Sequence, residues 1–137
     1  MPTVIRPELS KKNKWFVEKY RYLELKNFCR QFPIWEKAYQ SLNALSKKEN
    51  DIIQDTQGFE DKTAKTAIAM EFYSKRMDMI KDTCKEADPE IADYILIGVT
   101  KGVPYDIIQV NYDIPCSRDT YYDRYRKFFY LLNKARE

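Results

Sequence analysis

The sequence predicts an all-α fold with an N-terminal helical hairpin, a long middle helix and a C-terminal helix-turn-helix. The 137 residues include only 3 Gly and 6 Pro, which are too few for the many tight turns of a β-sandwich or barrel. Apolar residues recur at the three- and four-residue spacing of a helix face through most of the chain. Proline, glycine and capping residues stand where those patterns stop, as they do at the ends of helices.

Residues 1–60 are expected to form the N-terminal helical hairpin and a polar linker. Apolar side chains recur at helical spacing over about 14–32 and again over about 33–45, and Pro33 should separate the two helices. The mostly polar stretch 46–61 is typical of a linker.

Residues 61–87 are expected to form a long connecting helix, because this stretch contains neither Gly nor Pro. Its apolar side chains repeat at alternating spacings of three and four, which is the pattern of a coiled-coil seam. The seam consists of Met70, Tyr73, Met77, Ile80 and Cys84. Two heptads are too few to separate a homodimer seam from an internal packing stripe, so both interpretations stay open.

The region 88–137 is expected to begin with a buried helix. Asp88 can cap it, with Pro89 at its first position, and most of the residues that follow are apolar. Gly102 is a natural stop for this helix.

A short helix, a turn and a longer basic helix are expected to follow. Pro104 should open the short helix, and Asp113-Ile114-Pro115 should break it. Ser117 then caps a long helix that runs from Arg118 to about Arg136. A short helix, a turn and a long basic helix, braced by a buried helix in front, make the helix-turn-helix layout.

The last helix has the two faces that a recognition helix needs. Tyr121, Tyr125, Phe128 and Leu132 share the face that should pack on the supporting helices. Arg126 on the other side could pair with guanine, and Asp119 could accept from cytosine. The predicted DNA-binding residues are Arg118, Asp119, Tyr122, Arg126 and Lys127, with Ser117 as the cap of the recognition helix.

The same segment resembles the recognition-helix motif of RinA- and ArpU-type regulators from phages and prophages of Gram-positive bacteria. The motif is close to hydrophobic-x-x-Ser-Arg-x-Thr-Tyr-Tyr-x-x-Arg-Arg. The matching residues are Ser117, Arg118, Thr120, Tyr121, Tyr122 and Arg126. Asp119 and Asp123 depart from the family, which often has Ser or Arg there. The resemblance implies a helix-turn-helix like that of sigma region 4 and activation of late genes.

Charge is unevenly placed along the chain, although the net charge is only +3. Residues 1–30 have a net charge of +5, residues 31–116 of −5, and residues 117–137 of +3. Basic ends could meet an anionic polymer such as DNA, and a solvated surface gives the same counts. The N-terminal Lys11, Lys12 and Lys14 could at most meet phosphates.

Composition argues against an enzyme. The chain has no His, and its three cysteines, Cys29, Cys84 and Cys116, form no C-x-x-C pair, so no catalytic residue, metal site or cofactor is predicted. Cys116 at a helix start beside Arg118 could have a lowered pKa. Sparse cysteines fit a reducing cytoplasm, here that of a bacterial host, and no apolar run is long enough to span a membrane.

The sequence therefore predicts a phage or prophage DNA-binding protein that regulates transcription. Double-stranded DNA is the expected partner, together with RNA polymerase or another protein. One alternative is a helical phage protein that uses the acidic region 31–116 to bind and inhibit, or to adapt, a host or phage protein. Another is a small terminase-like packaging protein.

Overall fold

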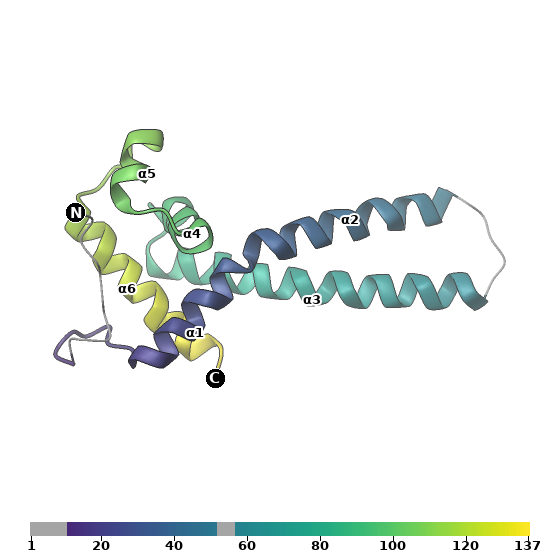
Figure 1. Cartoon of the computed structure of the whole chain (residues 1–137), viewed down its shortest axis with the longest axis horizontal. Coiled ribbons are helices and arrows are strands. Elements are labelled where there is room, and N and C mark those ends of the chain that lie inside the picture. The colour runs from purple at the N-terminus through teal and green to yellow at the C-terminus, as the bar shows by residue number, and fades with distance from the viewer. Residues whose placement is uncertain (1–10, 52–56) are drawn as a thin grey trace. The chain divides into compact units, whose positions relative to one another are not determined.

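The computed structural model describes secondary structure for residues 11–51 and 57–137, and side chains for residues 11–47 and 63–137. This part of the chain is entirely helical and contains no strand, which confirms the predicted all-α class (Figure 1). The helices are α1 (Lys19–Arg30), α2 (Phe32–Asp51), α3 (Gln57–Ala87), α4 (Ala92–Lys101), α5 (Tyr105–Tyr112) and α6 (Arg118–Ala135).

The chain divides into two compact units. The core unit comprises Met1–Gln31 and Met79–Glu137, and therefore holds α1, the last turns of α3, and α4 to α6. The hairpin unit comprises Phe32–Asp78 and holds α2 and most of α3. These borders differ from the predicted 60/61 and 87/88, because the first helix joins the C-terminal region and α3 contributes to both units.

Three N-terminal boundaries differ from the predicted ones. The first helix begins at Lys19 rather than near residue 14, because the Glu18 side chain caps it by accepting from the Arg21 N–H. The second helix continues past residue 45 to Asp51, and α3 already begins at Gln57. The predicted linker is thus mostly helical, since Lys, Glu and Gln favour helix even where no apolar face is present.

Parts of two predicted segments lie outside the described residues. They are the start of the N-terminal region, over residues 1–10, and the centre of the linker, over residues 52–56.

The prediction that Pro89 opens a helix is wrong, because α4 begins only at Ala92. Asp88 Oδ1 accepts a hydrogen bond of 3.0 Å from the Glu90 N–H, which holds the following residues in a turn. The other carboxylate oxygen of Asp88 lies 3.2 Å from Arg124 Nε of α6. Asp88 thus anchors a turn to α6 instead of capping α4. The stop at Gly102 is confirmed, since this residue has φ +70° at the C-cap of α4.

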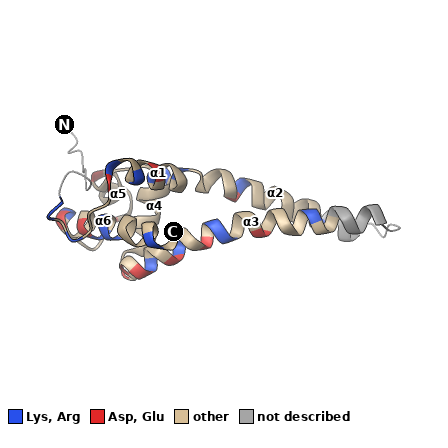
Figure 2. Ribbon diagram, turned by 90° about the horizontal axis from the view of Figure 1, so that it is seen from below, with Lys and Arg blue, Asp and Glu red and all other residues tan. Residues whose placement is uncertain are grey.

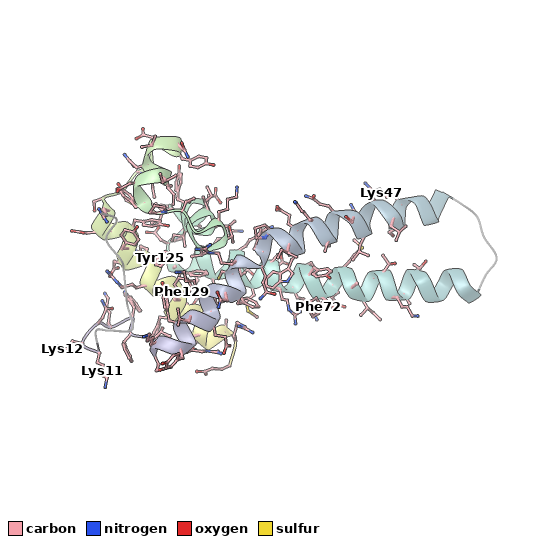
Figure 3. The ribbon with its side chains drawn as sticks, in the orientation of Figure 1. Lys11, Lys12, Lys47, Phe72, Tyr125 and Phe129 are labelled. Carbon is pink, nitrogen blue, oxygen red and sulfur yellow. The ribbon has the colours of Figure 1, made fainter. Side chains whose placement is uncertain are left out.

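Aromatic side chains of α6 form the centre of the core unit. Tyr121, Phe128 and Leu132 are fully buried, which confirms most of the predicted packing face. Phe129, which the prediction left out, is also fully buried, and its ring centroid lies 4.9 Å from that of Tyr22 of α1. Tyr125 is partly buried, 5.0 Å from Phe129 between ring centroids (Figure 3). The packing face is therefore broader than the predicted single stripe.

In the hairpin unit, α2 and α3 run alongside each other (Figures 1 and 2). Apolar side chains remain exposed on both helices: Ile34, Leu45, Ile68 and Phe72. Along the described part of α3, basic and acidic positions are interspersed rather than segregated (Figure 2). No helix in the described chain is both long enough and apolar enough to pass through a membrane.

The predicted seam of the middle helix is divided between the two units. Ile80 and Cys84 are buried in the core unit, which agrees with an internal packing stripe at these two positions. In the hairpin unit, Met77 is buried, whereas Met70 and Tyr73 are only partly buried. A homodimer through this helix stays a prediction.

Candidate nucleic-acid interface

The helices α4, α5 and α6 form a three-helix arrangement in which each helix contacts the other two. A five-residue link, 113–117, joins α5 to α6. It begins at Asp113, which ends α5 in the left-handed conformation with φ 53°. It ends at Ser117, whose hydroxyl oxygen accepts from the Thr120 N–H at 3.2 Å, so the predicted cap of α6 is confirmed.

Tyr105 fixes the position of α5 relative to the link and to α6. Its hydroxyl donates to the Cys116 carbonyl oxygen at 2.6 Å. Its N–H donates to the Tyr122 hydroxyl at 3.1 Å. Its ring lies 5.6 Å from that of Tyr121 between centroids. One residue at the start of α5 thus holds both the end of the link and the first turns of α6.

The first turn of α6 is open to solvent. Asp119 and Thr120 are exposed, and the Arg118 side chain retains 39% of its surface. The Arg118 guanidinium lies 3.9 Å from the Asp106 carboxylate of α5, a distance at which an exposed ion pair contributes little. Arg118 and Asp119 are therefore accessible from solvent at the start of α6.

The Tyr122 side chain is not accessible from solvent in the way that Arg118 and Asp119 are. It is only 9% exposed, and its hydroxyl already accepts from the Tyr105 N–H. Its ring packs against Tyr121 and Tyr125, with centroid distances of 5.1 and 5.8 Å. The sequence predicted Tyr122 as a DNA-binding residue, but its close contact with α5 places the side chain in the core.

The middle of α6 is covered as well. Every residue from Tyr121 to Asn133 is buried or partly buried, including Arg126 and Lys127. Part of the cover is Trp15, whose ring centroid lies 5.3 Å from that of Tyr130 and 5.5 Å from the Lys127 ammonium. Within the described chain, Arg126 forms no ion pair. This cover could not be predicted from the sequence, because no spacing rule relates Trp15 to a helix more than 100 residues further along the chain.

Arg124 organises the charges beside the link. It pairs with Asp88 at 3.2 Å and also with the neighbouring Asp123 carboxylate. The negative charge of Asp123, which would repel phosphates, is therefore balanced within the protein. The role of Arg124 could not be predicted from the sequence, since the i, i+4 rules do not reveal a partner as distant in sequence as Asp88.

The expected lowering of the Cys116 pKa is wrong. Burial raises the pKa of the Cys116 thiol, and the Asp88 carboxylate raises it further, while Arg124 acts in the opposite direction. Burial also raises the pKa of Cys84 to about 12 and raises that of Cys29 still more. Among the described side chains, no three Cys, Asp or Glu residues are grouped so that they could hold a metal ion.

No family model, curated protein or solved structure matches this chain.

Proposed function

We propose that this chain is a DNA-binding protein in which α4, α5 and α6 act as a helix-turn-helix, with α6 entering the major groove. The observation that carries the proposal is the open first turn of α6, at the end of a short link and braced by two mutually contacting helices. A recognition helix needs both properties, because its N-terminal residues must reach base edges while its supports hold the angle of entry.

The proposed contacts follow the exposure of α6. Arg118 and Asp119 stand at the open end and would meet bases or the nearest phosphates. Arg126, two turns further on, is the basic side chain of α6 proposed to read a base, since it is partly accessible and has no described ion partner. Lys127, beside Trp15, would meet a phosphate. Tyr122 is left out, because its ring and hydroxyl serve the core.

We further propose that the DNA-binding protein is a phage or prophage transcription regulator in the cytoplasm of a bacterial host. The motif shared with RinA- and ArpU-type regulators includes Ser117 and Arg118, the residues that cap α6 and stand at its open end. A regulator of this type would also contact RNA polymerase or another protein.

The proposal is tested by selecting binding sites from random DNA duplexes with the wild type and two variants. Arg126→Ala should flatten the preference at one base position, since an arginine–guanine pair discriminates by about 1–3 kcal/mol. A triple Lys11, Lys12 and Lys14 to Gln variant should keep the preference and lower the salt slope by about one per lost phosphate contact.

Lys134→Ala is the matched control, because it removes an exposed charge from the opposite end of the same helix. It should leave the preference unchanged. If the wild type enriches no sequence at moderate salt, the DNA-binding proposal fails.

A protein adaptor is the second candidate, and exposed apolar side chains on α5 favour it. Val110 is 83% exposed, Tyr112 50% and Ile107 46%. Apolar side chains gain little from phosphates and more from a protein surface. A selection without enrichment would direct the search to a protein partner for this helix.

A further inference from the structure

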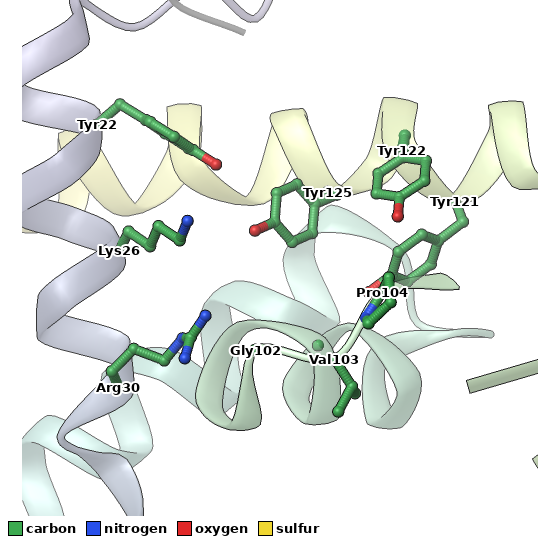
Figure 4. A pocket seen from close by; sticks show the side chains of 10 residues that line it. Tyr22, Lys26, Arg30, Gly102, Val103, Pro104, Tyr121, Tyr122 and Tyr125 are labelled. Atoms are coloured by element: carbon green, nitrogen blue, oxygen red, sulfur yellow. The ribbon is translucent and has the colours of Figure 1, made fainter. Parts of the chain in front are cut away.

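A pocket of about 200 Å³ lies within the core unit, between α1, the C-terminal end of α4 and the inner face of α6 (Figure 4). Basic side chains enter it from α1 and tyrosines line it from α6. The polar lining residues are Tyr22, Lys26, Arg30, Tyr121, Tyr122 and Tyr125. The DNA-binding proposal makes no use of this pocket.

Two cations share the pocket. Lys26 and Arg30 are one helical turn apart, so they lie on the same face of α1 and repel each other. Figure 4 shows both side chains reaching toward the tyrosines of α6. In the described part of the chain, neither is paired with a carboxylate. Arg30 is exposed and Lys26 is partly buried, so solvent reaches both cations, but no described carboxylate offsets their charge at the pocket.

The Arg30 guanidinium is placed by the end of α4. It lies so close to the backbone of Gly102 that a Cβ at this position would collide with it. The carbonyl groups at a helix C-terminus carry partial negative charge, which attracts the guanidinium. That attraction accounts for the position of Arg30 but not for Lys26, and it leaves the guanidinium without a full counter-charge.

Tyrosine hydroxyls supply hydrogen-bond donors on the other side. The Tyr121 side chain is fully buried, and its hydroxyl has no hydrogen-bond partner in the structure. A Cβ at Gly98 would collide with this hydroxyl, so the glycine leaves room for it. The Tyr125 hydroxyl points toward Lys26 on the α1 side of the pocket, and the Tyr122 hydroxyl points toward Pro104 (Figure 4). Burial raises the pKa of Tyr121, so its hydroxyl keeps its proton at neutral pH and can donate.

We propose that this pocket binds a small oxyanion of the phosphate class, with Lys26 and Arg30 balancing its charge and the Tyr121 hydroxyl donating to it. Two cations and the unpartnered Tyr121 hydroxyl line one cavity, and an oxyanion is a ligand that can pair with the cations and accept from the hydroxyl. The volume suits a phosphate group or a small phosphorylated molecule. Because Pro104 precedes α5 and the tyrosines belong to α6, the bound anion would join α1 to the helix-turn-helix.

The test is thermal unfolding of the full chain with increasing inorganic phosphate, at an ionic strength held constant with chloride. A ligand that binds only the folded state raises the melting temperature. The wild type should show such a rise, and Lys26→Gln and Arg30→Gln should each weaken the apparent phosphate affinity by about tenfold or more. Lys85→Gln, an exposed lysine of the same unit outside the pocket, is the control and should behave as the wild type.

The Tyr121→Phe variant distinguishes a loss of phosphate binding from a general loss of stability. Without phosphate it should melt at the wild-type temperature or higher, because it removes a buried hydroxyl that has no partner. Added phosphate should raise the melting temperature of this variant less than that of the wild type. The proposal is overturned if phosphate does not raise the melting temperature, or if all three pocket variants respond like the wild type.

A second arm identifies the source of the phosphate group. Each variant is titrated with a short DNA duplex, and its affinity is compared with its phosphate response. A Lys26→Gln chain that loses the phosphate response and keeps duplex affinity supports a free anion. Loss of both supports a site for a phosphate of the DNA backbone.

Discussion

The core unit and the hairpin unit are both helical, but contacts described within them differ in sequence range. In the core unit, ring contacts join distant segments, as between Tyr22 of α1 and Phe129 of α6 at 4.9 Å. Along α3 in the hairpin unit, the Lys75–Glu71 ion pair at 3.0 Å and the Arg76–Phe72 cation–π contact at 3.4 Å each join residues four apart. Local contacts make a helix, whereas distant contacts make a tertiary structure.

This difference predicts a difference in stability. Tertiary burial of an apolar face supplies most of the stability of a helix in a protein, and local pairs supply a few tenths of a kcal/mol each. The core unit buries Tyr121, Phe128 and Phe129 completely. The hairpin unit buries Phe32 and Trp35 at 6% and 5% exposure but leaves Ile34 and Ile68 about two-thirds exposed, at 66% and 67%. Substitutions of the same kind should therefore have different effects in the two units.

The largest expected effect is that of truncating a central aromatic ring. Phe128→Ala should lower the free energy of unfolding by about 3–5 kcal/mol, because Phe128 is fully buried and its removal leaves a cavity. Phe72→Ala in the hairpin unit is the matched control. It should cost about 1 kcal/mol, since Phe72 is 46% exposed and loses mainly its contact with Arg76. Urea unfolding measures both, and equal losses would refute the proposed difference between the units.

Replacing a serine by alanine should change the free energy of unfolding in opposite directions in the two units. Ser117→Ala removes the cap of α6 and should cost about 1 kcal/mol. Ser74→Ala lies inside α3, where the hydroxyl only donates to the Glu71 carbonyl oxygen, and alanine is the better helix former. This variant should gain a few tenths of a kcal/mol. A loss for Ser74→Ala in urea unfolding would show that its side chain has a tertiary role.

Local signals in the sequence predicted the local features of the fold. The Ser117 cap and the Gly102 stop depend on neighbours within a few residues, and the packing face of α6 depends on its own periodicity. Pairings across the chain could not be predicted in this way. The cover of α6 by Trp15 and the burial of Tyr122 by α5 arise only when segments distant in sequence pack together.

The candidate site shows the same limit. The sequence predicted the open end of α6 with Arg118 and Asp119, because a cap marks where a helix starts. It did not predict the pocket, since Lys26 and Arg30 stand on α1 and Tyr121 on α6, near opposite ends of the chain. Side chains from such distant segments share no spacing rule.

The smallest expected effect concerns the cysteines, which occur in the core unit and not between residues 32 and 78. Cys116 is partly buried, whereas Cys29 and Cys84 are fully buried. Iodoacetamide should therefore modify Cys116 alone in the native protein and reach the other two thiols only when the core unit unfolds. Mass spectrometry of native and urea-treated samples counts the adducts.

The pH dependence of this labelling follows from the raised pKa of Cys116. The thiolate is the reactive form, and burial disfavours it, so native Cys116 should react more slowly than a free thiol at about pH 8. The labelling rate of Cys116 should keep rising with pH after that of a free thiol, with a pKa of about 8.5, has levelled off.

The raised pKa values of the buried cysteines also predict how stability depends on pH. The unfolded chain loses its thiol protons first, so the core unit should lose stability as the pH rises above about 8.5. If Cys29 or Cys84 reacted in the native state at the rate of Cys116, the interior of the core unit would be as accessible to the reagent as the partly buried Cys116. The proposed contrast with the hairpin unit would then be wrong.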